Sequence, residues 1–171
     1  DGCGWTVSGG ESHSCGLMSS GSIECWGSND SGESDPPEGS FVQVSAGRLF
    51  SCGLKADGEA ECWGVEDNGV LTPPDLSYVE VGCGGVHGCG LTEDGTVACW
   101  GSAADGRTTP PDVTFSQLSV GFNHSCGLTT AGTIECWGRE KYGGLDAPAG
   151  TYEQVSTGGY FGCALLSSGS I

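Results

Sequence analysis

A 37-residue repeat runs through the chain and limits its fold more than any other feature, as the steps from Cys15 to Cys52 and from Trp26 to Trp63 illustrate. Two cysteine series keep this step: the first is Cys15, Cys52, Cys89, Cys126 and Cys163, and the second is Cys25, Cys62, Cys99 and Cys136. A tryptophan follows each cysteine of the second series, at Trp26, Trp63, Trp100 and Trp137. Periods of this length are typical of solenoids and propellers. We expect one repeat domain over residues 1–171, with units at about 4–40, 41–77, 78–114, 115–151, and 152–171 together with 1–5.

Each unit carries the pattern of a tight β-hairpin. In the second unit, residues 41–45 alternate apolar and polar side chains, and residues 51–55 and 59–63 flank a short loop. The third loop position is glycine in every unit, at Gly21, Gly58, Gly95, Gly132 and Gly169. Glycine accepts the positive φ that a three-residue hairpin loop needs at this position. The sequence therefore predicts three to four strands per unit, the fourth being a short edge strand near Val70–Thr72.

The hairpin brings the two cysteine series together. A loop at residues 19–21 places Cys15 directly opposite Cys25, where the Cβ separation suits a disulfide. We predict the same bond in four units: Cys15–Cys25, Cys52–Cys62, Cys89–Cys99 and Cys126–Cys136. The chain has 11 cysteines and lacks the Cys-x-x-Cys spacing that is common in zinc sites. Paired cysteines indicate an extracellular or cell-surface location.

The repeat is incomplete at its two ends. The fifth hairpin stops at Ile171, before its second cysteine, whereas Cys3 and Trp5 stand near the other end in nearly the arrangement that is missing. We expect Cys3 to bond to Cys163 and the N-terminal strand to complete the fifth hairpin. This closes a five-bladed ring within one chain, or joins chains head to tail in a filament. Cys83 is left unpaired, either as a small buried thiol or as a link to another chain.

The recurring motifs resemble a known repeat. They read H-S-C-G-L at residues 124–128, D-G-T-V-A-C-W-G at 94–101 and F-V-Q-V-S-A-G at 41–47. These motifs resemble the repeat of the regulator of chromosome condensation family, and are most similar to the disulfide-bearing form in bacterial surface proteins. The resemblance implies an all-β fold of propeller blades with about four short strands each. The best-known members have seven blades, whereas this chain has at most five units. The chain also lacks a basic surface, so the chromatin and GTPase roles of the family are not carried over.

The charge balance excludes several classes of partner. There are 5 Lys and Arg residues against 22 Asp and Glu residues, a formal net charge of −17. Such a chain repels nucleic acid and anionic membrane surfaces, and it has no apolar run long enough to insert into a membrane. We expect no cofactor. Calcium is a weak alternative at the acidic loops 29–35 and 66–69, which lack an ordered calcium-loop spacing.

Binding residues are predicted where the units differ. Residues 28–31, 65–68, 102–105 and 139–142 read SNDS, VEDN, SAAD and REKY within a constant frame. Variation of this kind often maps to a binding face. The candidates are Asn29, Asp30, Glu66, Asp67, Arg139, Lys141 and Tyr142. Asn29 and Asn123 also begin N-x-S glycosylation sequons.

Two other recurring residue types favour packing over chemistry. His13, His87 and His124 share a repeat position with Phe50 and Phe161, which a metal site would not accept. The four recurring tryptophans are better suited to core filling between blades than to sugar stacking. No G-x-S-x-G, P-loop or H-E-x-x-H motif occurs, so we expect no enzyme activity.

These observations favour an extracellular structural protein that assembles with copies of itself, with donation of the N-terminal strand from one chain to the next as the route to a filament. The alternative is a secreted binding module that recognises another extracellular protein or a glycan through its variable loops.

Overall fold

The computed structural model describes residues 6–168. Within them the chain is all β apart from one short 3-10 turn, η1 (Ala104–Gly106). The strands are β1 (Thr6–Gly9), β2 (His13–Leu17), β3 (Ile23–Gly27), β4 (Phe41–Ala46), β5 (Phe50–Lys55), β6 (Ala60–Gly64), β7 (Tyr78–Cys83), β8 (His87–Thr92), β9 (Val97–Gly101), β10 (Phe115–Val120), β11 (His124–Thr129), β12 (Ile134–Gly138), β13 (Tyr152–Thr157) and β14 (Gly162–Leu166).

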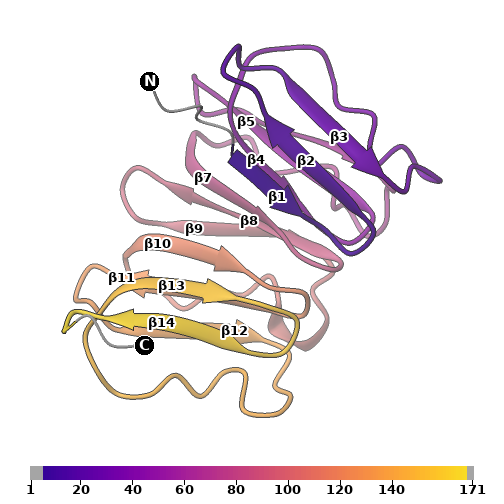
Figure 1. Cartoon of the computed structure of the whole chain (residues 1–171). Helices are drawn as coiled ribbons and strands as arrows, with labels where there is room; N and C mark the ends of the chain where they lie inside the picture. Colours follow the sequence, from indigo (N-terminus) through magenta and orange to yellow (C-terminus); the bar gives the residue numbers. More distant parts are fainter. Residues whose placement is uncertain (1–5, 169–171) are drawn as a thin grey trace.

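The strands form five antiparallel sheets, here called blades one to five. Blades one to four have three strands each, in the orders β1-β2-β3, β4-β5-β6, β7-β8-β9 and β10-β11-β12, and blade five contains β13 and β14. The blades follow one another in a fan, and the first strand of each packs against the first strand of the next (Figure 1). The expected edge strand near residues 70–72 is wrong, because backbone hydrogen bonds such as Val70 N to Asp67 O close turns there.

The hairpins have the predicted register. Leu17 faces Ile23 and Cys15 faces Cys25 across β2 and β3, and the same pairing recurs in the next three blades. The third loop residue has positive φ in each of these hairpins, for example 88° at Gly21 and 89° at Gly58. A glycine at this position therefore fixes the turn without steric strain.

The four hairpin disulfides are present: Cys15–Cys25, Cys52–Cys62, Cys89–Cys99 and Cys126–Cys136. Their Cα atoms lie 4.0 to 4.1 Å apart, the close approach of directly opposed residues. Each disulfide links the two strands of one hairpin. No disulfide of these four crosses between blades, so the interfaces between blades depend on packing.

The core lies between neighbouring blades. Between blades two and three, Cys52 and Leu54 pack against Tyr78, Val81 and Trp100. Equivalent clusters form between blades one and two and between blades three and four. The packing role predicted for the tryptophans is correct for Trp63, Trp100 and Trp137, which are at most 8% exposed, whereas Trp26 on the open face of blade one is 54% exposed.

Candidate functional site

The loops that follow the first strand of each blade surround a hollow at one end of the fan. Backbone hydrogen bonds join these loops in series, from Glu11 N to Gly47 O at 3.1 Å and from Arg48 N to Gly84 O at 3.1 Å. The series continues with Phe122 N, which donates to Gly158 O at 3.2 Å. One loop of every blade is thereby held in a fixed position around the hollow.

A glycine begins each of these loops, at Gly10, Gly47, Gly84, Gly121 and Gly158. A Cβ atom on Gly47 would lie 2.5 Å from the carbonyl oxygen of Gly84, and one on Gly84 would lie 2.5 Å from that of Gly121. Only glycine allows the loops to approach so closely. The repeated glycine therefore allows the neighbouring loops to pack closely against one another around the hollow.

Side chains of the first strands tie the blades together beneath the loops. Ser8 Oγ accepts a hydrogen bond from Ala46 N at 2.9 Å, and Ser45 Oγ accepts one from Cys83 N at 3.0 Å. The next blade has Gly82 at this position and no hydroxyl there. That blade keeps a second connection, in which Glu80 Oε2 accepts from Leu118 N at 2.9 Å, as Gln43 Oε1 accepts from Val81 N at 2.9 Å in the blade before.

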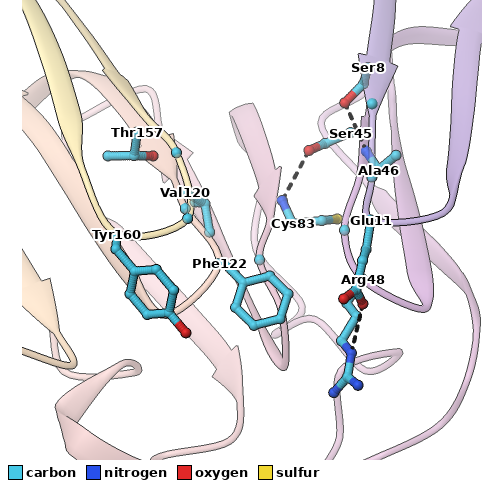
Figure 2. Close-up of a pocket in the computed structure, with 17 residues that line it drawn as sticks. Ser8, Glu11, Ser45, Ala46, Arg48, Cys83, Val120, Phe122, Thr157 and Tyr160 are labelled. Carbon is cyan, nitrogen blue, oxygen red and sulfur yellow. Dashed lines mark hydrogen bonds and ion pairs between the residues drawn. The ribbon is translucent and has the colours of Figure 1, made fainter. Parts of the chain in front are cut away.

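The hollow has a volume of about 560 Å³ and is lined by residues of all five blades. The residue after each repeated glycine varies from blade to blade: Glu11, Arg48, Gly85, Phe122 and Gly159. On one side, the Arg48 guanidinium pairs with the Glu11 carboxylate at 2.8 Å. The ring of Phe122 lies next to this pair, with its centroid 6.0 Å from the Arg48 guanidinium, and the ring of Tyr160 lies on the far side of Phe122 (Figure 2). One region of the surface thus offers an ion pair and two aromatic rings on a rigid frame.

Cys83 lies at the base of the hollow. Its side chain is buried, and its thiol is free in the structure. Burial raises the pKa of Cys83 to about 12, which makes it a poor nucleophile. Its equivalents Ala46, Val120 and Thr157 are also small, so the position favours a packing role over a covalent link.

The predicted variable loops begin at the same end of the fan as the hollow. Ser28 N donates to Ser12 O, Val65 N to Leu49 O, and Arg139 N to Asn123 O. The loop of blade four contacts a residue that lines the hollow. Lys141 Nζ lies 4.8 Å from the ring centroid of Tyr142 and 4.6 Å from that of Tyr160, which lines the hollow.

Some of the predicted binding residues make hydrogen bonds within their own loops. Glu66 accepts hydrogen bonds from the backbone N–H groups of Gly69 and Leu71, and Asn29 Nδ2 donates to Asp35 Oδ1 at 2.9 Å. Asp30, Asp67 and Arg139 are exposed, as is Tyr142 with 81% of its surface accessible. The structure therefore places Lys141 and Tyr142 next to Tyr160, whereas Glu66 and Asn29 make hydrogen bonds within their own loops.

The histidines pack between blades. His13 Nε2 lies 2.7 Å from Ser51 Oγ, and His87 Nε2 lies 2.9 Å from Ser125 Oγ. Burial lowers the pKa of His13 and His124, and lowers that of His87 to about 4 with help from Arg107 and His124. Within residues 6–168, no three side chains of His, Cys, Asp or Glu are grouped so as to hold a metal ion.

The two predicted glycosylation sites and Cys163 differ in how exposed they are. Asn123 is only 7% exposed and its Oδ1 accepts a hydrogen bond from Arg107 Nη2, so this sequon lacks room for a glycan. Asn29 is exposed. Cys163 is exposed and free, and its expected partner Cys3 lies outside the described residues.

Sequence reasoning missed the position occupied by Glu11, Arg48 and Phe122. Its signal was present, because a freely varying residue directly follows a repeated glycine in every unit. Strand ends in a repeat architecture face the same side in every unit, which is why they gather around one hollow.

The chain is similar to a family of repeats described as the regulator of chromosome condensation (RCC1) repeat. That family model matches residues 6–33, 41–70, 78–107 and 115–143. No curated protein matches the sequence. In the part of the chain that the structure describes, no helix is long and apolar enough to span a membrane.

Solved structures with the same fold include two plant receptor ectodomains. The ectodomain of the Physcomitrella patens receptor kinase CR4 has a TM-score of 0.82 at 30% identity, over 96% of this chain and 47% of that one. The CRINKLY WD40 ectodomain of the Arabidopsis thaliana receptor kinase ACR4 has a TM-score of 0.80 at 28% identity, over 94% and 60%. Prp20p of Saccharomyces cerevisiae shares the fold at 14% identity, with a TM-score of 0.80 over 93% and 55%. The chain thus spans about half to three fifths of these structures.

Proposed function

This chain belongs to the regulator of chromosome condensation repeat family, and we propose that it is an extracellular module that binds a protein partner through the face around the hollow. The observation that carries the proposal is the contrast between a fixed frame and its variable lining. The glycines that hold the loops recur in every unit, whereas the residues that follow them include Glu11, Arg48 and Phe122. A rigid scaffold with variable loops at one end is a common arrangement for recognition.

The extracellular location is supported by the four disulfides and by the two similar receptor ectodomains. Disulfides of this kind persist in oxidising compartments and are rare in the cytosol. A protein partner suits the fold, because Prp20p, which shares this fold, binds Gsp1p and histones. The net charge of −17 favours a basic partner surface over an acidic one.

Photo-crosslinking tests the proposed face. A photoreactive phenylalanine is placed at Phe122 or at Tyr160 of the full chain, and the protein is exposed to the culture medium and cell surface of its source. We expect both positions to capture the same defined partner. Glu93 and Ala56 provide matched controls, because they are exposed residues at the hairpin tips, at the opposite end of the blades. Capture of that partner from the tips alone contradicts the proposal.

Head-to-tail self-assembly is a second candidate function. Val7 and Trp26 on blade one are 58% and 54% exposed, and Phe161 on blade five is 64% exposed. The same repeat positions are buried between blades as Val44, Trp63 and Phe50. Because blade one presents the face that packs on a preceding blade, and blade five the face that receives a following one, two copies would stack in the manner of consecutive blades.

Sedimentation velocity tests this second candidate. We expect the wild-type chain to form oligomers whose size increases with protein concentration. Trp26→Glu should abolish these oligomers. Val113→Glu is the control, since Val113 is 44% exposed in a loop outside both faces. A wild-type chain that remains monomeric at high concentration rules out self-assembly and leaves the binding module in place.

A further inference from the structure

Blades two and three are joined along their first strands by three hydrogen bonds from side chains of β4. Gln43 Nε2 donates to Val81 O at 3.2 Å, and Gln43 Oε1 accepts from Val81 N at 2.9 Å. Ser45 Oγ accepts from Cys83 N at 3.0 Å. A glutamine amide carries both a donor and an acceptor. The side chain of Gln43 therefore satisfies both backbone groups of Val81.

Blades three and four have different residues at these repeat positions. Glu80 takes the place of Gln43, and Gly82 takes the place of Ser45 without a hydroxyl group. Glu80 Oε2 accepts a hydrogen bond from Leu118 N at 2.9 Å. In the part of the chain that the structure describes, this is the one bond that these two positions make to β10. The joint between blades three and four thus depends on Glu80.

The neighbour of Gly82 prevents a serine from restoring the missing bond. A Cβ atom on Gly82 would lie 2.6 Å from Val120 Cγ2, closer than two carbon atoms can approach without displacement. The residues equivalent to Val120 in the two preceding blades are Ala46 and Cys83, which have smaller side chains. The larger valine therefore requires glycine opposite it and leaves Glu80 as the side-chain connection.

The protonation state of Glu80 determines how many hydrogen bonds it makes. An ionised carboxylate only accepts hydrogen bonds, whereas a protonated carboxyl also donates one. By the equivalence with Gln43, the second oxygen of Glu80 stands where Gln43 has its Nε2 donor, next to Leu118 O. An ionised Glu80 repels that carbonyl oxygen, and a protonated Glu80 donates to it. Glu80 is half-buried, and this burial raises its pKa against the opposing effect of the Leu118 N–H group.

The charged groups around Glu80 do not fix its protonation state. The strands packed against β7 are β4, β5, β8 and β10, and β4 and β10 contain no titratable residue. Apart from disulfide cysteines, the titratable residues are Lys55 on β5, His87 on β8, and Tyr78 and Cys83 on β7 itself. Lys55 forms ion pairs with two glutamates of its own blade. Among residues 6–168, Glu80 has no ion-pair partner.

We propose that Glu80 is a proton-controlled joint between blades three and four, which takes up a proton from mildly acidic solvent and then donates a hydrogen bond to Leu118 O. The protonated side chain makes both of the bonds that Gln43 makes in the preceding blade. Leu118 lies on β10, which leads into Val120 and Phe122 at the hollow. The joint therefore sets how firmly the Phe122 side of the hollow is held to blade three. This regulation of the frame goes beyond the proposed function.

The proton should stabilise the folded chain. Because the pKa of Glu80 is raised above its unfolded value of about 4.3, the folded chain binds the proton at a higher pH than the unfolded chain does. The contribution of Glu80 to stability therefore grows as the pH falls from neutral toward about 4.3. The buried histidines act in the opposite direction, so the effect of Glu80 must be isolated by substitution.

Glu80→Gln provides the test, because it copies the protonated state at every pH. Glutamine is the natural residue at the equivalent positions Gln43, Gln117 and Gln154, so the variant should fold. Glu153→Gln is the control: Glu153 is exposed on β13, and its substitution removes the same charge away from the joint. Urea midpoints of the full chain are compared for the wild type and both variants at a pH of about 7.5 and of about 5. The histidines are common to all three proteins and cancel in the differences.

We expect the midpoint of Glu80→Gln to exceed that of the wild type near pH 7.5, and the gap to shrink by at least half near pH 5. Glu153→Gln should follow the wild type at both values. The absence of a gap near pH 7.5, or a gap that does not change with pH, overturns the proposal.

A second measurement detects the proton itself. Carbon-13 resonances of the glutamate carboxyl groups are followed in the folded chain, and those of Glu80 and Glu153 are assigned by their loss in the two variants. The Glu80 resonance should titrate at a higher pH than the Glu153 resonance, and coincident titration of the two overturns the proposal. Both measurements use the chain alone, so neither result depends on the partner of the rim.

Discussion

The indole Nε1 of Trp100 donates a hydrogen bond to the carbonyl oxygen of Val70 across 2.9 Å. This bond joins the third strand of blade three to the turn that follows the third strand of blade two. Both residues are buried, at 5% and 2% exposure. Since Trp63 and Trp137 make the same bond with Glu33 and Arg107, one geometry holds three successive interfaces together.

Replacing this indole should destabilise the fold. Trp100→Phe removes the donor and leaves Val70 O without its partner, and we expect it to cost about 1–3 kcal/mol of unfolding free energy. Trp26→Phe should change stability by less than about 0.5 kcal/mol, because Trp26 is 54% exposed. Urea titrations followed by circular dichroism compare the two. Equal midpoints contradict the role assigned to the bond.

The buried histidines should make the protein sensitive to acid. Burial, with Arg107 and His124, lowers the pKa of His87 to about 4. Between the unfolded value near 6.5 and pH 4, the unfolded chain binds a proton that the folded chain excludes. Stability should therefore fall as pH drops through this window, by roughly 3 kcal/mol from His87. His13 and His124 act in the same direction, whereas burial raises the pKa of Glu80 and opposes them.

A paired substitution isolates the contribution of His87. His87→Phe with Ser125→Gly copies the natural pair of Phe50 and Gly88 at the equivalent positions. Thermal melts of this variant should depend less on pH between 6.5 and 4 than those of the wild-type chain. An unchanged pH profile would assign the acid sensitivity to other groups.

Each hairpin disulfide should contribute to stability through its own blade. Replacing Cys89 and Cys99 by alanine opens a loop with a sequence separation of 10 and should cost about 2–3 kcal/mol. Calorimetry of the double variant measures the change in melting temperature. Reduction of the wild-type protein should have a larger effect, because it opens four such loops. A double variant as stable as the wild type would show that interblade packing alone sets stability.

Cys83 and Cys163, the free thiols among residues 6–168, should differ in reactivity. Cys83 is buried and its pKa is raised to about 12, whereas Cys163 is exposed. Iodoacetamide at neutral pH should alkylate Cys163 in the native protein and reach Cys83 only after unfolding. Peptide mapping by mass spectrometry distinguishes the two sites. Rapid alkylation of native Cys83 would mean that the base of the hollow opens to solvent.

The hairpins and the division into propeller blades followed from the sequence, whereas the individual contacts between blades did not. The pairing of Cys15 with Cys25 depends only on a three-residue loop, so hairpin geometry determines it. The contact between Trp100 and Val70 joins residues of different units, and a repeat pattern alone does not reveal which positions of neighbouring units meet. The exposure of Trp26 has the same origin, since its burial would require a blade on its open side.

The site was predicted in part for similar reasons. Loop variation indicated Lys141 and Tyr142 as binding residues, and the structure places Lys141 against the ring of Tyr160, which lines the hollow; their role in binding stays a prediction. It did not separate Glu66, which accepts two backbone hydrogen bonds of its own loop, from residues that face solvent. A varying acidic residue in a turn serves either purpose, and only the backbone geometry distinguishes them.

The proposed function requires that a protein partner bind the face around the hollow. Its most direct test is the affinity of the crosslinked partner for three forms of the chain, measured by biolayer interferometry. We predict that Phe122→Ala with Tyr160→Ala weakens binding at least tenfold, and that Glu93→Ala at a hairpin tip leaves it within twofold of the wild type. Unchanged affinity for the rim variant, together with a loss for the tip variant, would contradict the account.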